Sequence, residues 1–164
     1  MTLSERLAPE LEREIKTTRK LLERVPTDKF TWAPHEKSMP LGRLASHIAE
    51  MPSWVTGTVQ LEFMDIDANY KPWTAASPDE LLSKFDSYAA EAGKVLSGAS
   101  DEVLGKMWAL RMGGQELFAA PREQVIRTLV LSHLIHHRGQ LSVYLRLLDI
   151  PVPSIYGPSA DETS

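Results

Sequence analysis

The sequence predicts an all-α protein that folds as a four-helix bundle. Four segments carry apolar residues at helical spacing, and no segment alternates apolar and polar residues over the length of a strand. The chain has 164 residues, of which 43% are hydrophobic and 24% charged, as in a globular protein with one core. We therefore expect a single domain over residues 1–164.

The first two helices are predicted from their start signals and apolar faces. The first begins at Thr2, which forms a capping box with Glu5, and it ends at Pro26. The second begins at Ser38, and Pro52 within its apolar face predicts a kink. The apolar positions recur every three or four residues: Leu3, Leu7, Leu11, Ile15, Leu22 and Val25 in the first helix, and Leu41, Leu44, Ile48, Met51 and Val55 in the second.

The third and fourth helices follow from the same signals. Ser77–Glu80 forms a second capping box with proline at the first helical position, and Gly98 is a suitable C-terminal stop. The fourth helix runs from Pro121 to about Leu148 as one continuous helix. Its apolar face carries Val125, Ile126, Leu129, Leu141, Tyr144, Leu145 and Leu148, together with His133 and His137.

Two connections between helices and the C-terminal segment have distinct characters. Asp65–Ala76 is predicted to be a loop. Gly113–Gly114 lies between two short apolar runs and predicts a short β-hairpin before the last helix. After the last helix, the proline-rich segment Pro151–Pro158 cannot be helical, and we expect it to pack on the bundle as an ordered strap.

Charge and cysteine content exclude several classes of function. The net charge is −4 and there is no basic block, so the chain is not expected to bind nucleic acid. No apolar stretch is long enough to span a membrane, and the chain begins without an export signal, which favours the cytoplasm. With no cysteine, the chain has no thiolate ligand or cysteine nucleophile, so nitrogen and oxygen atoms must hold any metal.

Three histidines form a candidate metal site. His133 and His137 are four residues apart, so they lie on one helix face, and His47 lies on the apolar face of the second helix. Such residues can simply line a bundle with each ring bonded to a neighbour. Three imidazoles that point into one core, however, make a site with three protein ligands and an open position, as in catalytic metal sites.

Other residues near these positions have weaker claims. Glu50, one turn beyond His47, is a candidate fourth ligand or proton acceptor, or else a solvated carboxylate. Gln140 is a candidate hydrogen-bond donor in the pocket. His136 is expected at a helix or subunit contact and His35 in a structural turn. Gly139, inside a helix, predicts close approach of another helix or a ligand.

Several known chemistries are absent from the sequence. It contains no Glu-x-x-His, His-Glu-x-x-His, glycine-rich phosphate loop or Gly-x-Ser-x-Gly motif. Its four tryptophans suit either core and interface packing or the wall of an aromatic pocket: Trp32, Trp54, Trp73 and Trp108.

Five stretches of the chain resemble the DinB-like family: Phe30–His35, Leu41–Trp54, Leu131–Leu141, Tyr144–Arg146 and Ile150–Ser159. The resemblance spans nearly the whole chain. It implies a bundle with up-down-down-up connectivity and a homodimer. It also implies a divalent cation, most often nickel or zinc, on the three histidines that correspond to His47, His133 and His137.

Relatives in this family include bacillithiol transferases and mycothiol-dependent maleylpyruvate isomerases. The resemblance therefore implies a metal-dependent transferase that joins a low-molecular-weight thiol to a small electrophile, or a hydrolase. Glu50 is the candidate catalytic residue because of its position one turn beyond His47. A non-catalytic metal-binding protein, acting in a stress response or as a sensor, is the alternative.

Overall fold

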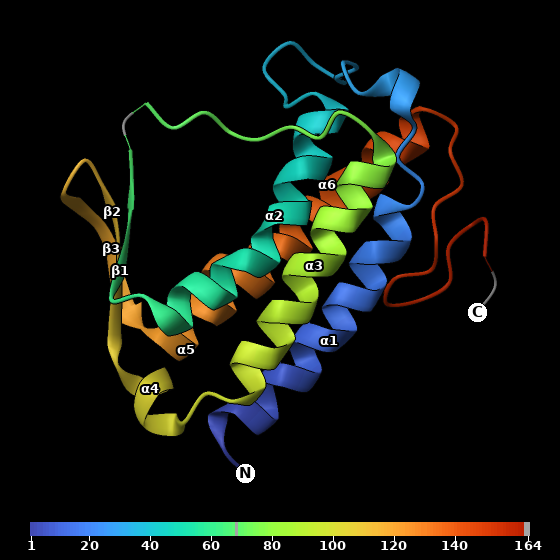
Figure 1. The fold of residues 1–164 in the computed structure, drawn as a ribbon. Coiled ribbons are helices and arrows are strands. Elements are labelled where there is room, and N and C mark those ends of the chain that lie inside the picture. The colour runs from blue at the N-terminus through green and yellow to red at the C-terminus, as the bar shows by residue number, and fades with distance from the viewer. Residues whose placement is uncertain (68, 163–164) are drawn as a thin grey trace.

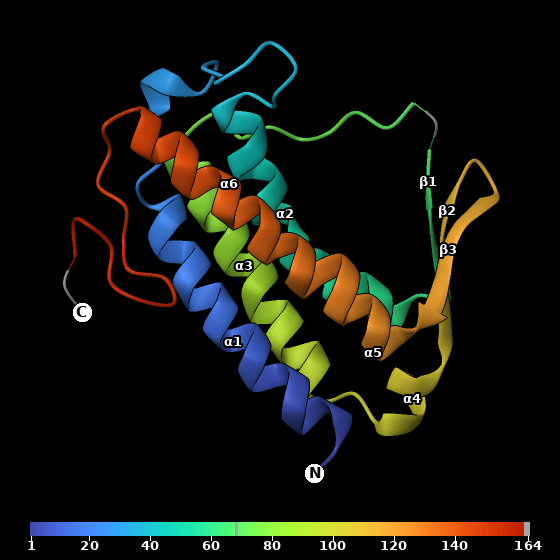
Figure 2. The ribbon, with the colours of Figure 1, turned by 180° about the vertical axis from the view of Figure 1, so that it is seen from behind.

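The computed structural model describes residues 1–67 and 69–162 and contains the predicted helical bundle (Figure 1). Helix α1 runs up the bundle, α2 and α3 run down, and the last long helix runs up again (Figures 1 and 2). This is the up-down-down-up order. The helices are α1 (Leu3–Leu22), α2 (Leu41–Gln60), α3 (Pro78–Ser97), and a last helix built from α5 (Arg122–Val125), η2 (Ile126–Ser132) and α6 (His133–Leu147).

The predicted helix starts are confirmed for α1 and α3, but the predicted capping box is complete only at α1. Thr2 and Glu5 form the complete capping box. At α3, the Ser77 hydroxyl accepts a hydrogen bond from the Glu80 amide as expected. The Glu80 carboxylate instead accepts hydrogen bonds from the Ala76 amide and the Trp73 indole, so it holds the preceding loop.

Helix α2 begins at Leu41, three residues later than the predicted start at Ser38. Pro40 caps the helix with an extended backbone (φ −58°, ψ 151°). A proline also disfavours helical backbone at the residue before it, so the helix begins only after Pro40. Farther along, α2 continues through Pro52 without a break and changes direction in its middle (Figure 1).

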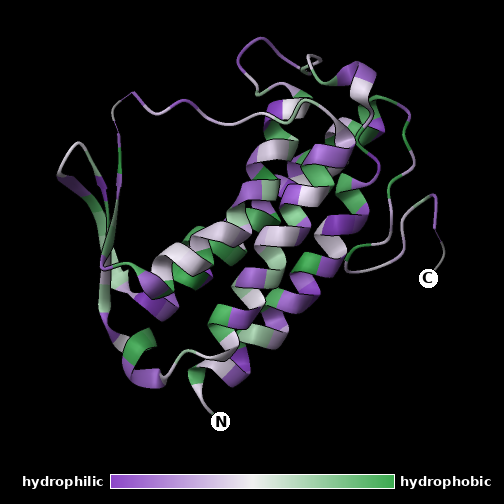
Figure 3. Ribbon diagram, viewed as in Figure 1, coloured by the Kyte–Doolittle hydropathy of each residue, from purple (hydrophilic) through white to green (hydrophobic). Residues whose placement is uncertain are grey.

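The core lies between the four long helices. Helices α2 and α3 pack closely together, α1 packs against α3, and the last helix packs against α1 and α2. Hydropathy alternates around each helix, as the amphipathic sequence pattern requires (Figure 3). Among the described residues, no helix is both long and apolar enough to cross a membrane.

A three-stranded sheet stands beside the lower ends of α2 and α5 (Figure 1). The predicted hairpin is confirmed as β2 (Met107–Met112) and β3 (Gln115–Pro121). Gly113 and Gly114 form its turn with positive φ angles of 57° and 81°, which glycine adopts without strain.

The segment predicted as the loop Asp65–Ala76 begins instead as a strand. Strand β1 (Phe63–Ile66) pairs in parallel with β2, and the Asp65 carboxylate accepts hydrogen bonds from the Gly114 amide. A four-residue edge strand is too short to show a pattern, and its partner is distant in sequence. Ala68, within the same predicted loop, lies outside the described residues.

Two short elements were absent from the sequence prediction: η1 (Thr27–Lys29) and α4 (Asp101–Gly105). No other helix approaches Gly139 closely, because outside its own helix backbone and chain neighbours no described atom lies within 4 Å of a Cβ placed there, while close approach of a ligand stays a prediction. Close approach occurs instead at Gly42, where a Cβ would lie 2.9 Å from the Phe30 ring.

The C-terminal strap is confirmed as an ordered, non-helical segment. Tyr156 from the strap donates a hydrogen bond to the Glu14 carboxylate of α1, and Arg138 of α6 pairs with the same carboxylate at 2.7 Å. Arg138 also donates hydrogen bonds to the Tyr156 hydroxyl and to Thr18. This network, which we call the Arg138 network (Glu14, Thr18, Arg138 and Tyr156), joins α1, α6 and the strap; its first three members are buried and Tyr156 covers them from the surface.

Candidate metal centre

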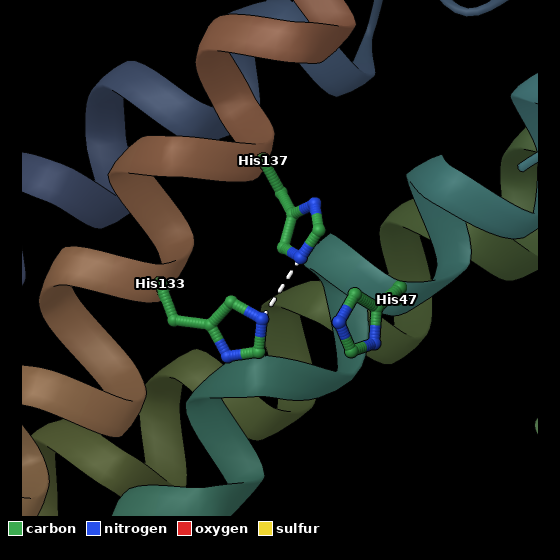
Figure 4. Close-up of side chains that lie close together, drawn as sticks. All are labelled: His47, His133 and His137. Atoms are coloured by element: carbon green, nitrogen blue, oxygen red, sulfur yellow. Dashed lines mark hydrogen bonds between the residues drawn. The ribbon is translucent and has the colours of Figure 1, made fainter. Parts of the chain in front are cut away.

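Three histidine rings converge between α2 and α6 (Figure 4). One nitrogen from each of His47, His133 and His137 lies within 4.8 Å of the others. The Nε2 atoms of His133 and His137 are 2.8 Å apart. The described residues therefore contain a group that could hold one metal ion, made of the three histidines predicted from the sequence.

Each of the three rings has a partner on the side away from the cluster. His47 Nδ1 lies 3.1 Å from Glu50 Oε1, and His137 Nδ1 lies 2.6 Å from Gln140 Oε1. The backbone carbonyl of Leu129 accepts a hydrogen bond from the His133 ring. At His137 the acceptor holds the ring proton on Nδ1 and leaves Nε2 free as a ligand. At His47 Nδ1 the Glu50 acceptor competes with the Arg43 guanidinium, which lies 3.4 Å away and can only donate.

The segment just before His133 departs from the sequence prediction of one continuous α-helix. Residues of η2 form a π-helix, in which backbone hydrogen bonds span five residues instead of four. The wider turn changes the angular position of His133 relative to residues before the π-helix. Segments of this kind occur often at functional sites, and here the π-helix ends at a histidine of the cluster.

Burial keeps the imidazoles of His133 and His137 neutral. It lowers the pKa of His137 to about 4, against an opposing effect of the Gln140 hydrogen bond, and His47 and His133 lower it further. Burial also lowers the pKa of His133, to which His47 contributes as well. Metal ligation requires neutral imidazole, so at neutral pH these two rings are already in the ligating form.

The arrangement suits a cation. The Nε2 atoms of His133 and His137 lie 2.8 Å apart and form a hydrogen bond, so one ring donates to the other when no cation is bound (Figure 4). A cation bound at these nitrogens would take the place of the shared proton. Three nitrogen ligands suit zinc, nickel, copper or iron, so the donor set fits a divalent transition metal without selecting one.

Glu50 lies beside the cluster and not within it. Its Oε1 atom faces His47 and also pairs with Arg43 at 3.0 Å. Arg43 in turn donates a hydrogen bond to the carbonyl of Trp73 in the loop before α3. The alternative of Glu50 as a solvated carboxylate is therefore wrong, while its role as a proton acceptor stays a prediction.

The other polar candidates agree only in part with their predicted places: Gln140 is exposed and does not line the cavity, and in the described residues no hydrogen bond or ring contact joins His136 to another helix, while its place at a subunit contact stays a prediction. Gln140 contacts His137 as predicted, but as an acceptor instead of a donor. His136 is exposed and its ring packs against the ring of His137. His35 accepts a hydrogen bond from the Lys37 amide in an exposed turn.

A cavity of about 330 Å³ adjoins the histidines. His47 and His133 line one part of it, together with Arg43 and Glu50. Two of the four tryptophans, Trp54 and Trp108, form part of its wall, whereas Trp32 packs edge-on against Tyr144 in the core. The sequence did not predict that the sheet closes this cavity; β1 and β2 contribute Met64, Ile66, Trp108 and Leu110.

Replacing Gln140 is expected to weaken metal binding without removing a ligand. In Gln140→Ala the His137 ring loses its acceptor, so its orientation and tautomer are no longer held, and we expect metal affinity to fall about 10- to 100-fold. Gln140→Glu keeps an oxygen acceptor and should retain most of the affinity. Competition with a chromophoric chelator measures both variants, and an unchanged affinity in Gln140→Ala would contradict this role.

The low pKa of His137 predicts how the stability of the metal-free protein depends on pH. The unfolded chain binds a proton at this imidazole below about pH 6.5, whereas the folded chain binds it only near pH 4. The free energy of unfolding should therefore fall as the pH drops from about 6.5 to 4, and this contribution should be constant above that range. Urea unfolding with a chelator present, compared with His137→Gln, isolates the effect; identical pH profiles would disprove it.

The fold and the site together define the class: this is a four-helix-bundle protein in which three histidines on two facing helices could hold a metal ion. The chain matches the sequence profile of the DinB family over residues 2–164, and it belongs to this family.

Individual relatives agree with this assignment. The chain is 26% identical to the uncharacterized protein YrdA of Bacillus subtilis over 158 residues, which cover 92% of this chain and 86% of that protein. A DinB-like protein of Bacillus cereus has a similar fold, with a TM-score of 0.67 and 22% identity over 88% of this chain and 92% of that one. The DinB-like protein YjoA of Bacillus subtilis superposes with a TM-score of 0.64 and 20% identity, over 89% and 95% of the two chains.

Proposed function

We propose that this protein binds one divalent cation, nickel or zinc, through His47, His133 and His137 and transfers a low-molecular-weight thiol to a small electrophile. Hydrolysis by an activated water is the neighbouring reaction. The observation that carries the proposal is the convergence of three imidazoles beside a cavity that two of them, His47 and His133, line. Since the chain has no cysteine, the thiol has to enter as a cosubstrate, and the same composition is in keeping with the cytoplasm.

His47, His133 and His137 would hold the divalent ion, which when bound would lower the pKa of a thiol or water and so supply a nucleophile at neutral pH. The chain's own residues do the remaining work. The apolar walls exclude water from the nucleophile and hold the electrophile. Glu50, which lines the cavity and accepts from His47, is the candidate acceptor for the thiol proton.

The test uses protein loaded with cobalt or nickel and titrated with small thiols of different shape and charge. A thiol that enters the site produces a thiolate-to-metal charge-transfer band, and we expect saturable bands in the wild type and in His136→Ala. The His137→Ala variant should show none. A site with an accessible position but no thiol response would overturn thiol transfer in favour of water activation, and a closed site would favour a non-catalytic protein.

We also propose that the protein is a homodimer. Val143 and Leu147 project from the outer surface of α6 and are 56% and 58% exposed, which leaves apolar area that a second copy can cover. Light scattering at micromolar concentration should give twice the mass of the chain. The double variant Val143→Lys/Leu147→Lys should shift the mass toward the monomer, and a monomeric wild type would refute the proposal.

A further inference from the structure

The cavity extends from the histidines to the small sheet, and its two ends differ chemically. At one end lie the imidazoles of His47 and His133. At the other, β1 and β2 close the cavity with apolar side chains, which include Met64, Trp108 and Leu110. Ligand sites of this form bind an apolar body and orient it by a few polar groups at one side.

The two charged side chains on the cavity wall, Arg43 and Glu50, neutralise each other. Apart from the histidines, the ionisable side chains that line the cavity in the described residues are Arg43, Glu50 and Tyr70, and Tyr70 is uncharged at neutral pH. Arg43 and Glu50 pair with each other at 3.0 Å. A charged group of a ligand, placed against the sheet, would therefore lose its hydration without gaining an opposite charge, and the buried Trp108 indole N–H, which has no hydrogen-bond partner among the described residues, could offer it only a neutral donor.

We infer that the sheet end of the cavity binds the electrophile, and that this substrate is a small neutral molecule with an aromatic or alkyl body rather than a dicarboxylate. That the bound molecule reacts as the electrophile rests on the proposed function. That it binds at the sheet end rests on the cavity alone. A volume of about 330 Å³ lies at the lower end of ligand pockets and suits one or two fused rings.

Leu110 is the residue we expect to determine specificity. It lies on β2, lines the cavity and is partly buried, while Leu117 on the neighbouring strand β3 is 54% exposed and does not line it. The same substitution at these two positions therefore changes the cavity in one variant and only the outer surface in the other. His137 contributes to the metal cluster but does not line the cavity, so its loss should leave the apolar end unchanged.

The experiment is calorimetric titration of the metal-free protein, with a chelator present so that no metal can bind a carboxylate, using 2-naphthalenemethanol and 2-naphthoate, which have the same ring system and differ in charge. The neutral probe should bind once per chain, at least tenfold more tightly than naphthoate, in the wild type and in His137→Ala. Leu110→Trp, which fills the cavity, should weaken its binding at least tenfold, and Leu117→Trp should not. Thermal unfolding checks that both variants are folded.

The possible failures are distinguishable. Equal affinity for the two probes, no binding of the neutral probe, or equal effects of Leu110→Trp and Leu117→Trp would overturn the assignment of this end of the cavity. Should Leu110→Trp not fold, Leu110→Ala replaces it, and its enlarged cavity should bind a longer 2-naphthalene alcohol more tightly. Probe binding with no thiol band would overturn thiol transfer and leave the neutral-ligand site intact.

Discussion

Loss of the His137 imidazole should remove the metal from the protein. His137 supplies one of three ligands, and removal of even an outer hydrogen-bond partner of a metal ligand costs 10- to 100-fold in affinity, so removal of the ligand itself should cost more than about 100-fold. His133→Ala should behave in the same way, because its Nε2 atom faces that of His137. Protein purified without an affinity tag should carry about one metal per chain in the wild type and almost none in either variant.

His136 provides a matched control for this prediction. It is the neighbouring histidine in the sequence, but it is exposed and lies outside the cluster of three. His136→Ala should therefore retain the metal content of the wild type. Elemental analysis measures the metal, and circular dichroism verifies that helicity is preserved. Equal metal content in the wild type and His133→Ala would disprove the assignment of the site.

The second large effect is expected in stability, at Arg138. Its side chain is 1% exposed and pairs with a carboxylate of Glu14 that is 9% exposed. In Arg138→Met the carboxylate stays buried without its cation, which is expected to lower the free energy of unfolding by about 3–5 kcal/mol. Urea unfolding measures this loss.

Two further variants separate the buried charge from other effects of the substitution. Arg146→Ala removes a cation that is 48% exposed and pairs with Asp161 at the surface, so it should lower the free energy of unfolding far less than Arg138→Met does. The double variant Arg138→Met/Glu14→Gln removes both charges and should recover part of the stability lost in Arg138→Met. A loss below about 1 kcal/mol in Arg138→Met, or no recovery in the double variant, would contradict the role of the pair.

Local sequence determined the helices and the composition of the candidate site. Thr2 and Ser77 start α1 and α3 because a short hydroxyl side chain satisfies a free amide whatever the rest of the chain does. His133 and His137 share one face because the helical repeat places residues four apart side by side. A histidine among apolar neighbours, such as His47, needs a partner in the core, and this requirement is visible before the fold is known.

Contacts between segments far apart in the chain were decided only by the tertiary structure. Strand β1 exists because β2 pairs with it, and the cavity exists because that sheet stands beside α2 and α5. The Arg138 network depends on the return of the strap to α1, and Tyr156 carries no local signal of this contact. The angular position of His133 depends on the π-helix before it, which the apolar spacing does not reveal. Capping and periodicity act within a few residues and leave a pattern in the sequence, whereas strand pairing, buried ion pairs and cavity walls depend on residues that only folding brings together.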